Sequence, residues 1–251
     1  MKILLFAVLP VLIALVLVVI VLGAIVPRAT SNDQQFDLSA GEGVSVDLRN
    51  ATLHFVPSDD ADVHVEVSGF SWGGRAPLQT DDSGPLTEIS GGCRGGWFMV
   101  CRMTLVVEMP ADLPLTVEGT NGNITAEDLS GTLELRTTNG SLEVTNSLGE
   151  LDLRTTNGAI TVTDSSSALV ESGTTNGRVA LEFSRAPRTV EATSTNGAIS
   201  VRVPDDGEQY NIDADTVNGG VDTDSVPEDT DSARSISART TNGAVTITTT
   251  D

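Results

Sequence analysis

The chain has 251 residues and a formal net charge of −21, with 35 acidic residues against 14 basic ones, of which Lys2 is the only lysine. This charge excludes a basic nucleic-acid footprint and a polybasic lipid-binding surface, and two histidines with two cysteines barely supply a structural zinc site. An acidic, lysine-poor composition favours a halophilic source such as a haloarchaeon. An acidic secreted protein from a GC-rich genome would look similar.

Residues 3–26 form an apolar run without a charge. A helix of this length reaches about 36 Å, which is enough to cross the hydrocarbon core of a bilayer. The run exceeds the apolar core of a secretory signal, and no clean A-x-A cleavage site follows it. We therefore expect residues 1–30 to hold an uncleaved transmembrane anchor, with a cleaved signal as the alternative. Residues 27–35 are predicted to be a polar linker that keeps the following domain near the membrane.

Residues 31–110 contain short segments of alternating apolar and polar residues, such as 44–48, 63–67 and 103–107, which predict less regular β coils. The Gly-rich stretch 68–100 is predicted to be a long excursion. In it, Trp72 and Trp97 could form a platform for a glycan or a partner, or could pack over an irregular loop. Cys93 and Cys101 could form a disulfide if the domain is extracellular, or remain free thiols.

Residues 111–251 repeat an Asn-Gly unit at spacings of 18 to 24 residues, typified by L-E-L-R-T-T-N-G-S-L-E-V at 133–144. Such a period indicates a stacked architecture, and each arm of the unit alternates as a half-buried strand does. The corners are Asn121-Gly122, Asn139-Gly140, Asn157-Gly158, Asn176-Gly177, Asn196-Gly197, Asn218-Gly219 and Asn242-Gly243.

Two all-β folds fit this repeat. In a hairpin meander, Leu135 would face Val144 across each Asn-Gly turn. In a single-stranded parallel β-helix, or β-solenoid, each repeat is one coil and the stacked corners form a ladder of Asn side chains. Leu129, Leu148 and Leu169 recur between the strand pairs, and a three-sided coil would point them inward. We therefore favour the solenoid.

The T-x-N-G-x-[IV]-x-V repeats, preceded by Val107–Pro110 and Leu115–Val117, resemble the bacterial and archaeal β-strand-repeat domains known as putative adhesins. The resemblance covers residues 36–251. It implies the fold, and it brings no established active-site residues. A membrane-anchored rod of short coils is also similar in design to the bactofilins, which polymerise end to end as scaffolds, although bactofilins are usually cytoplasmic.

The sequence contains no phosphate loop, nucleophile elbow or metal-hydrolase helix, so we expect no catalytic, metal or cofactor site and no enzyme activity. His54 and His64 lie in alternating segments and are predicted to point outward. The acidic clusters lack the spacing of a calcium loop, which favours solvated loops. Three sequons make Asn50, Asn123 and Asn139 possible N-glycosylation sites.

The last repeat, 238–247, is close to consensus and no cap follows it. Val245 and Ile247 are therefore predicted to lie on an open strand edge at which rods could join. The resulting hypothesis is a self-associating scaffold of the cell envelope with a possible role in cell shape, anchored through residues 3–26 and with the C-terminal domain extracellular. The alternatives are an adhesin that binds an envelope protein or glycan, and a sensor domain of an envelope complex.

Overall fold

The computed structural model describes residues 29–31, 33–72, 77–93 and 101–250, and these residues contain strands but no helix. The strands are β1 (Ala29–Ser31), β2 (Gln34–Ser39), β3 (Val44–Arg49), β4 (Ala51–Pro57), β5 (Asp62–Trp72), β6 (Leu78–Asp81), β7 (Thr87–Gly92), β8 (Cys101–Met109), β9 (Leu115–Asn121), β10 (Ile124–Glu127), β11 (Leu133–Asn139), β12 (Leu142–Thr145), β13 (Leu151–Asn157), β14 (Ile160–Ser165), β15 (Leu169–Asn176), β16 (Val179–Phe183), β17 (Thr189–Asn196), β18 (Ile199–Pro204), β19 (Asn211–Asn218), β20 (Val221–Asp222), β21 (Ser235–Asn242) and β22 (Val245–Thr250).

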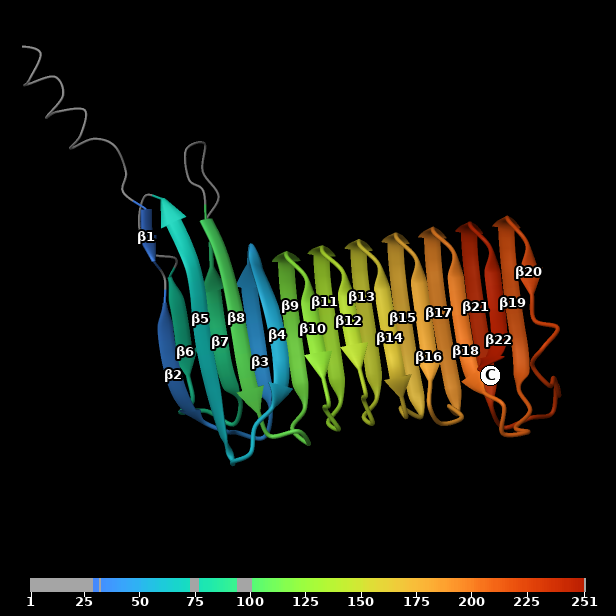
Figure 1. Cartoon of the computed structure of the whole chain (residues 1–251), viewed down its shortest axis with the longest axis horizontal. Helices are drawn as coiled ribbons and strands as arrows, with labels where there is room; N and C mark the ends of the chain where they lie inside the picture. The colour runs from blue at the N-terminus through green and yellow to red at the C-terminus, as the bar shows by residue number, and fades with distance from the viewer. Residues whose placement is uncertain (1–28, 32, 73–76, 94–100, 251) are drawn as a thin grey trace, which may run out of the picture.

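The strands form two long sheets that face each other along a rod (Figure 1). In each regular repeat the first arm joins a 10-stranded sheet, here called sheet B, and the second arm joins a 12-stranded sheet, sheet A. The Asn-Gly corner connects the two arms along one edge of the rod, and a longer turn connects them along the other. Neighbouring strands of the regular repeats are parallel, so the chain forms a β-solenoid as predicted.

The register excludes the hairpin meander. Leu135 pairs with Val117 and Leu153, the equivalent residues of the coils on either side. The coil has two sheet faces, so the expected three-sided coil was wrong. Leu129 is buried at the turn, whereas Leu148 is 55% exposed. Leu169 begins β15 and is half-buried.

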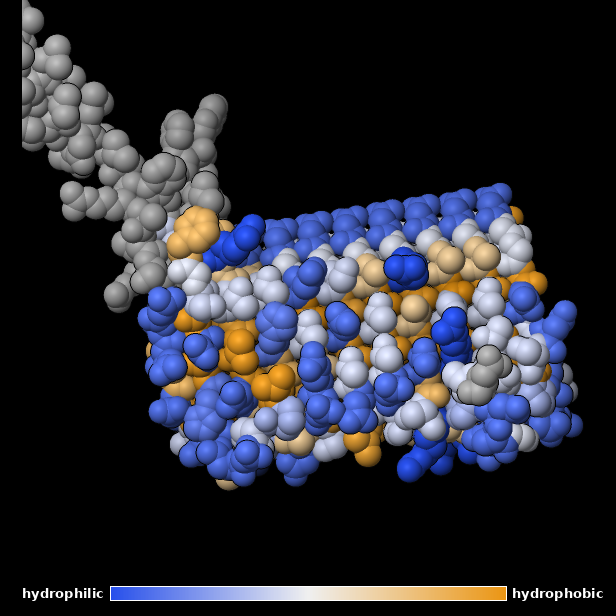
Figure 2. Space-filling view, in the orientation of Figure 1, coloured by the Kyte–Doolittle hydropathy of each residue, from blue (hydrophilic) through white to orange (hydrophobic). Residues whose placement is uncertain are grey.

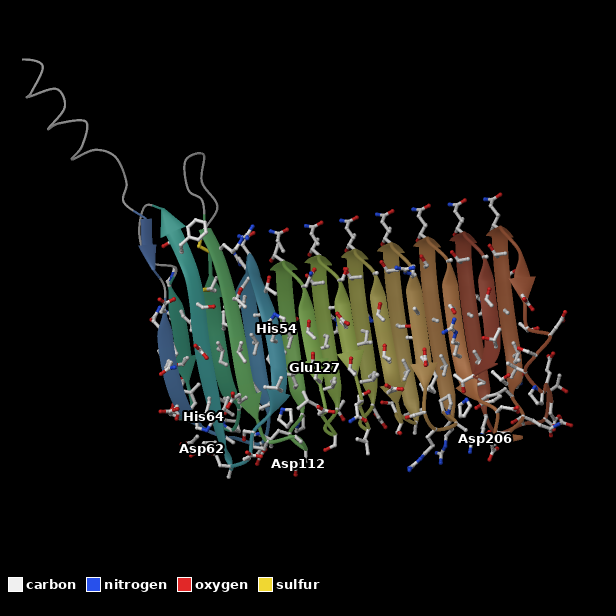
Figure 3. The ribbon with its side chains drawn as sticks, in the orientation of Figure 1. His54, Asp62, His64, Asp112, Glu127 and Asp206 are labelled. Carbon is white, nitrogen blue, oxygen red and sulfur yellow. A yellow bond between two sulfur atoms is a disulfide. The ribbon has the colours of Figure 1, made fainter. Side chains whose placement is uncertain are left out.

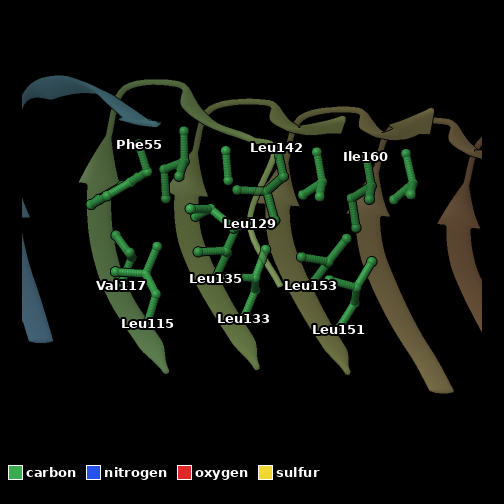
Figure 4. Close-up of a cluster of buried hydrophobic side chains, with 14 of the residues drawn as sticks. Phe55, Leu115, Val117, Leu129, Leu133, Leu135, Leu142, Leu151, Leu153 and Ile160 are labelled. Carbon is green, nitrogen blue, oxygen red and sulfur yellow. The ribbon is translucent and has the colours of Figure 1, made fainter. Parts of the chain in front are cut away.

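The core is a series of stacked aliphatic rows between the two sheets (Figure 4). Alternation along each strand turns every second side chain inward. For example, Leu133 and Leu135 on β11 and Leu142 on β12 have no exposed area. Each such side chain contributes about 1.5–3 kcal/mol when it is fully buried, so the repeat stabilises the rod with little aromatic content.

The N-terminal part adds two coils whose order in space differs from their order in the chain. β3 lies between β7 and β9, and β4 lies between β8 and β10. Antiparallel strands close this end: β5 pairs with β8, β1 and β2 pair with β5, and β6 pairs with β7. This end is called the capped end below.

The C-terminal coils are also out of chain order. In sheet B the strands run β17, β21, β19, and in sheet A they run β18, β22, β20. The last repeat of the chain, β21 with β22, thus lies between the coil of β17 and β18 and the coil of β19 and β20. The coil of β19 and β20 is the outermost one and is called the terminal coil below. The prediction that Val245 and Ile247 lie on an open edge was therefore wrong, because both side chains are fully buried and Val245 lies between Ile199 and Val221 of the neighbouring coils.

Within the described residues, no helix is long and apolar enough to cross a bilayer. The predicted anchor, residues 3–26, lies outside the described residues. Strand β1 occupies residues 29–31, inside the segment predicted to be a linker, where it pairs with residues 70–72 of β5.

Candidate functional site

The predicted Asn ladder runs along the corner edge of the rod. The Asn176 amide Nδ2 donates to Oδ1 of Asn157 at 2.8 Å, and Asn176 Oδ1 in turn accepts from Asn196 at 2.9 Å. The same bond links every Asn of the seven corners, always donated towards the capped end. Figure 2 shows a continuous hydrophilic row along one edge of the rod, and Figure 3 shows a row of side chains that project from the same edge. The amides therefore serve the stacking of the coils.

The Thr and Gly residues of the motif serve the same stacking. The Thr174 hydroxyl, which is almost buried, donates to the carbonyl of Gly158 in the preceding coil at 3.0 Å. A Cβ on Gly158 would lie 1.9 Å from the carbonyl oxygen of Gly140. Close approach of stacked backbones thus requires glycine at these corners. The backbone φ is positive at two of these corners, 138° at Gly122 and 157° at Gly243, where glycine is favoured.

Asn50 extends the ladder by a rung that the repeat pattern did not reveal, because no glycine follows it. Its φ is 56°, its Oδ1 accepts from Asn121 at 2.6 Å, and its Nδ2 donates to the Cys93 carbonyl at 2.7 Å. Cys93 and Cys101 form a disulfide across the corner between β7 and β8, with Cα atoms 5.7 Å apart. The ladder therefore ends at the disulfide.

This geometry bears on the three sequons. The Nδ2 atoms of Asn50 and Asn139, to which a glycan would attach, donate within the ladder. Asn123 lies just after the corner and is exposed, and its Oδ1 accepts from the Ser141 amide at 3.0 Å. N-glycosylation stays a prediction, and Asn123 is the sequon where it would leave the ladder bonds intact.

The outer face of sheet B carries a chain of ion pairs. Arg136 contacts Asp152 at 2.6 Å, and the same carboxylate contacts Arg154 at 3.0 Å. Arg136 also pairs with Glu134, and Arg154 with Glu171. The hydrogen bond to Glu171, and then the nearby carboxylate of Asp152, raise the pKa of the Arg154 guanidinium. Such exposed pairs contribute little each, and they fix cations that would otherwise be free to bind an anion.

A second polar cluster lies at the capped end. His64 on β5 contacts Asp37 on β2 through Nδ1 at 2.8 Å, and Asp60 in the preceding turn through Nε2 at 3.0 Å. Hydrogen bonds to Asp37 and then to Asp60 raise the pKa of His64 to about 9, so the imidazole carries a charge at neutral pH. His54 lies on the outer face of sheet A, two strands away, and Figure 3 shows the two histidines apart. The His64 cluster therefore links β2 to β5 at the capped end.

The terminal coil has a different character. Residues 203–233 hold ten acidic residues and no Lys or Arg. The flanking Arg234 contacts Glu208 at 2.8 Å, and Arg239 of β21 pairs with Asp213. Tyr210 is buried, and its hydroxyl makes no hydrogen bond within the described residues, so burial raises the pKa of this phenol to about 12.

The surface hollows of the described residues are shallow. A hollow of about 280 Å³ beside the disulfide is lined by Asp47, Arg49, Gln79 and Ser90, together with two glycines. Among the described residues, no group of three or more His, Cys, Asp or Glu side chains is arranged to hold a metal ion. Trp72 ends β5, but its side chain and all of Trp97 lie outside the described residues, so the predicted aromatic platform stays a prediction.

Comparison with known proteins identifies the repeat. The family profile described as Toastrack DUF4097 matches residues 113–251. A protein of Bacteroides fragilis described as a putative adhesin has a similar solved structure, with 13% identity and a TM-score of 0.50 over 89% of this chain and 97% of that one. A putative adhesin of Parabacteroides distasonis gives 13% identity and a TM-score of 0.44 over 88% and 97%. No curated protein matches the chain.

Proposed function

Because the chain belongs to the Toastrack DUF4097 family, in agreement with the resemblance drawn from its repeats, we propose that it is a non-enzymatic binding module of the cell surface. In this proposal residues 3–26 anchor the chain in the membrane and the solenoid lies outside the cell. The Thr, Asn and Gly residues of the repeat are committed to stacking, and the cations of sheet B are largely committed to ion pairs. In this proposal the regular repeats form a rigid support, and the interaction surface lies at one end of the rod.

The difference between the two ends of the rod carries this proposal. β1 enters the fold at the capped end, where Ala29 pairs with Trp72. Three peptide units separate the Cα atoms of Val26 and Ala29 and span at most about 11 Å. A membrane anchor at residues 3–26 would therefore hold the capped end close to the bilayer. The terminal coil lies at the other end of both sheets, where it is free to meet a partner.

The disulfide agrees with this location, because disulfides persist in oxidising compartments outside the cytoplasm. The excess of acidic residues agrees with it as well, since a strongly charged, solvated surface keeps an exposed rod soluble.

The single lysine of the chain allows a direct test of location. A membrane-impermeant amine reagent applied to intact cells should label a Thr156→Lys variant, because residue 156 is exposed on sheet B. The native chain, with only Lys2 and the amino terminus available, should be labelled only after lysis. Labelling of the variant only after lysis would contradict an external solenoid. Binding is tested by retention of cells that display the full chain on immobilised envelope material, against cells that display residues 1–30 alone.

A self-associating envelope scaffold is the second candidate, and one observation favours it: the terminal coil has no strand beyond it among the described residues. Association of such acidic ends should require salt, because the Debye length falls to about 3 Å at 1 M. Full chain in a neutral detergent should then form larger particles by light scattering as salt rises. Particles of constant size would exclude the scaffold and leave the binding module.

A further inference from the structure

We infer that the terminal coil is a docking edge for an extended, basic segment of a partner protein, which adds to sheet B as a further strand beside β19. This inference gives the proposed binding role a partner class and rests on that role. It is argued from the backbone of β19, from its two faces and from its charge.

The backbone of β19 offers an unpaired edge. The Asn211 amide donates to the Arg234 carbonyl at 2.9 Å, and residues 211–216 pair in parallel with β21. In a parallel ladder alternate residues bond to the same neighbour. Ile212, Ala214 and Thr216 therefore direct their N–H and C=O groups away from β21. Among the described residues no strand lies on that side, so these groups form a template for a further strand.

The loop after β20 leaves this template accessible. It covers the lower end of the coil, where the Tyr210 amide donates to the Pro227 carbonyl at 3.1 Å and Asp229 donates back to the Tyr210 carbonyl at 2.9 Å. Val226 is buried there. Beyond this point no strand pairs with the outer edge of β19 among the described residues, and Val217 near its far end and Val221 at the start of β20 are 71% and 46% exposed. These apolar side chains indicate a surface that a partner covers.

The two faces of β19 specify the side chains of that partner. Ile212 and Ala214 point towards the core and are only half-buried, so the added strand should place apolar side chains over them. Asp213 and Asp215 point outward and are exposed, and the carboxylate of Asp213 also pairs with Arg239 of β21. Side chains of the added strand on this face should be Lys or Arg, because directly opposite charges stabilise a cross-strand pair. The partner segment thus alternates basic and apolar residues.

The charge of the terminal coil favours a basic segment of another protein over a second copy of this chain as the strand that pairs with β19. Residues 203–233 carry ten acids without a cation. If two β19 strands pair about a two-fold axis and keep their outward faces aligned, Asp213 must lie opposite or beside Asp213 or Asp215 of the other copy. Like charges directly opposite are destabilising. A basic segment meets the same carboxylates with complementary charge, and strand addition to a sheet edge is a common mode of peptide recognition.

The experiment uses the full chain in a neutral detergent and a fluorescent, end-blocked octapeptide that alternates Lys and Val. Controls are a peptide of the same composition in two blocks and a peptide that alternates Glu and Val. We expect the alternating basic peptide to bind about tenfold more tightly than the block peptide, because only the former matches both faces of β19. Hydrogen exchange should show that the amides of residues 212, 214 and 216 gain protection when it binds.

Two variants separate strand addition from general attraction. Ala214→Pro removes an outward N–H on an edge strand, a position where proline is tolerated, and should weaken binding about tenfold. Asp213→Asn with Asp215→Asn should weaken it by a similar factor, whereas the matched pair Glu171→Gln with Glu191→Gln, on inner strands of the same sheet, should have little effect.

Equal binding of the block peptide, equal losses in both charge variants, or unchanged exchange at the three amides would overturn the inference. So would a dimer in sedimentation that protects the same amides without peptide, since a second copy would then occupy the edge. These measurements use purified protein, so a failure of surface labelling in cells would refute the proposed location without affecting them.

Discussion

Asn157 and Asn176 lie 19 residues apart in the chain, yet the amide of one donates to the carbonyl oxygen of the other at 2.8 Å. Their strands pair in register, so each amide both donates and accepts along the ladder. The direction of donation is the same at every rung. The ladder therefore aligns successive coils, and it needs no ligand to do so.

Removal of one rung should weaken the stack. In Asn176→Ala, the bonds to both neighbouring rungs are lost, and we expect the free energy of unfolding to fall by about 1–2 kcal/mol. Thr175→Ala is the matched control, because Thr175 is the exposed neighbour on the same strand. Chemical denaturation of both variants measures the difference. Equal stability of the two would show that the ladder adds nothing beyond solvation of its amides.

The corner glycines should tolerate no side chain. A Cβ at residue 158 would lie 1.9 Å from the Gly140 carbonyl oxygen, so Gly158→Ala must separate two coils. We expect a loss of about 1–3 kcal/mol. Gly220→Ala, whose Cβ would meet nothing within 4 Å, should change stability by less than about 0.5 kcal/mol. Thermal unfolding of the two variants provides the comparison, and a fully stable Gly158→Ala would contradict the close approach.

The histidine cluster predicts a pH dependence of the capped end. The pKa of His64 rises from an ordinary value of 6.5 to about 9 in the fold, mainly through Asp37 and then Asp60. Because the folded state binds the proton more tightly, the stabilisation is fully present below about pH 6.5 and is lost as pH rises through about 9. Denaturation at pH 6 and pH 9.5 should therefore show a smaller loss of stability in His64→Gln than in the native chain. Parallel losses in both proteins would assign the pH dependence to other groups.

Much of this fold follows from local features of the sequence. Each T-x-N-G unit carries its own hydroxyl donor, amide rung and corner glycine, so the repeat predicts strands joined at Asn-Gly corners, and the Asn ladder follows once the coils stack. Asn50 escaped the pattern because its left-handed corner has no glycine after it. No local residue marks it as a rung. Its bond to Asn121, 71 residues away, exists only in the folded stack.

The order of the terminal coils could not be predicted because both candidate coils carry the same corner. Asn218 and Asn242 are equivalent rungs, and the chain alone does not say which is the outer one. A hint is present in composition. The arm that ends at Asn218 places Asp at two outward positions, and the short arm after it has one apolar residue, Val221. A coil with so little to bury belongs at an end.

Two paired valines test that order. Val221 and Val245 are register partners on adjacent coils, but Val221 is 46% exposed and Val245 is fully buried. Val245→Lys places a cation without a partner in the core and should cost several kcal/mol or prevent folding. Val221→Lys should change the free energy of unfolding by less than about 1 kcal/mol, because its ammonium reaches water. Denaturation of both variants decides the order: if the coils stacked in chain order, Val245 would lie at the open end and the two results would be exchanged.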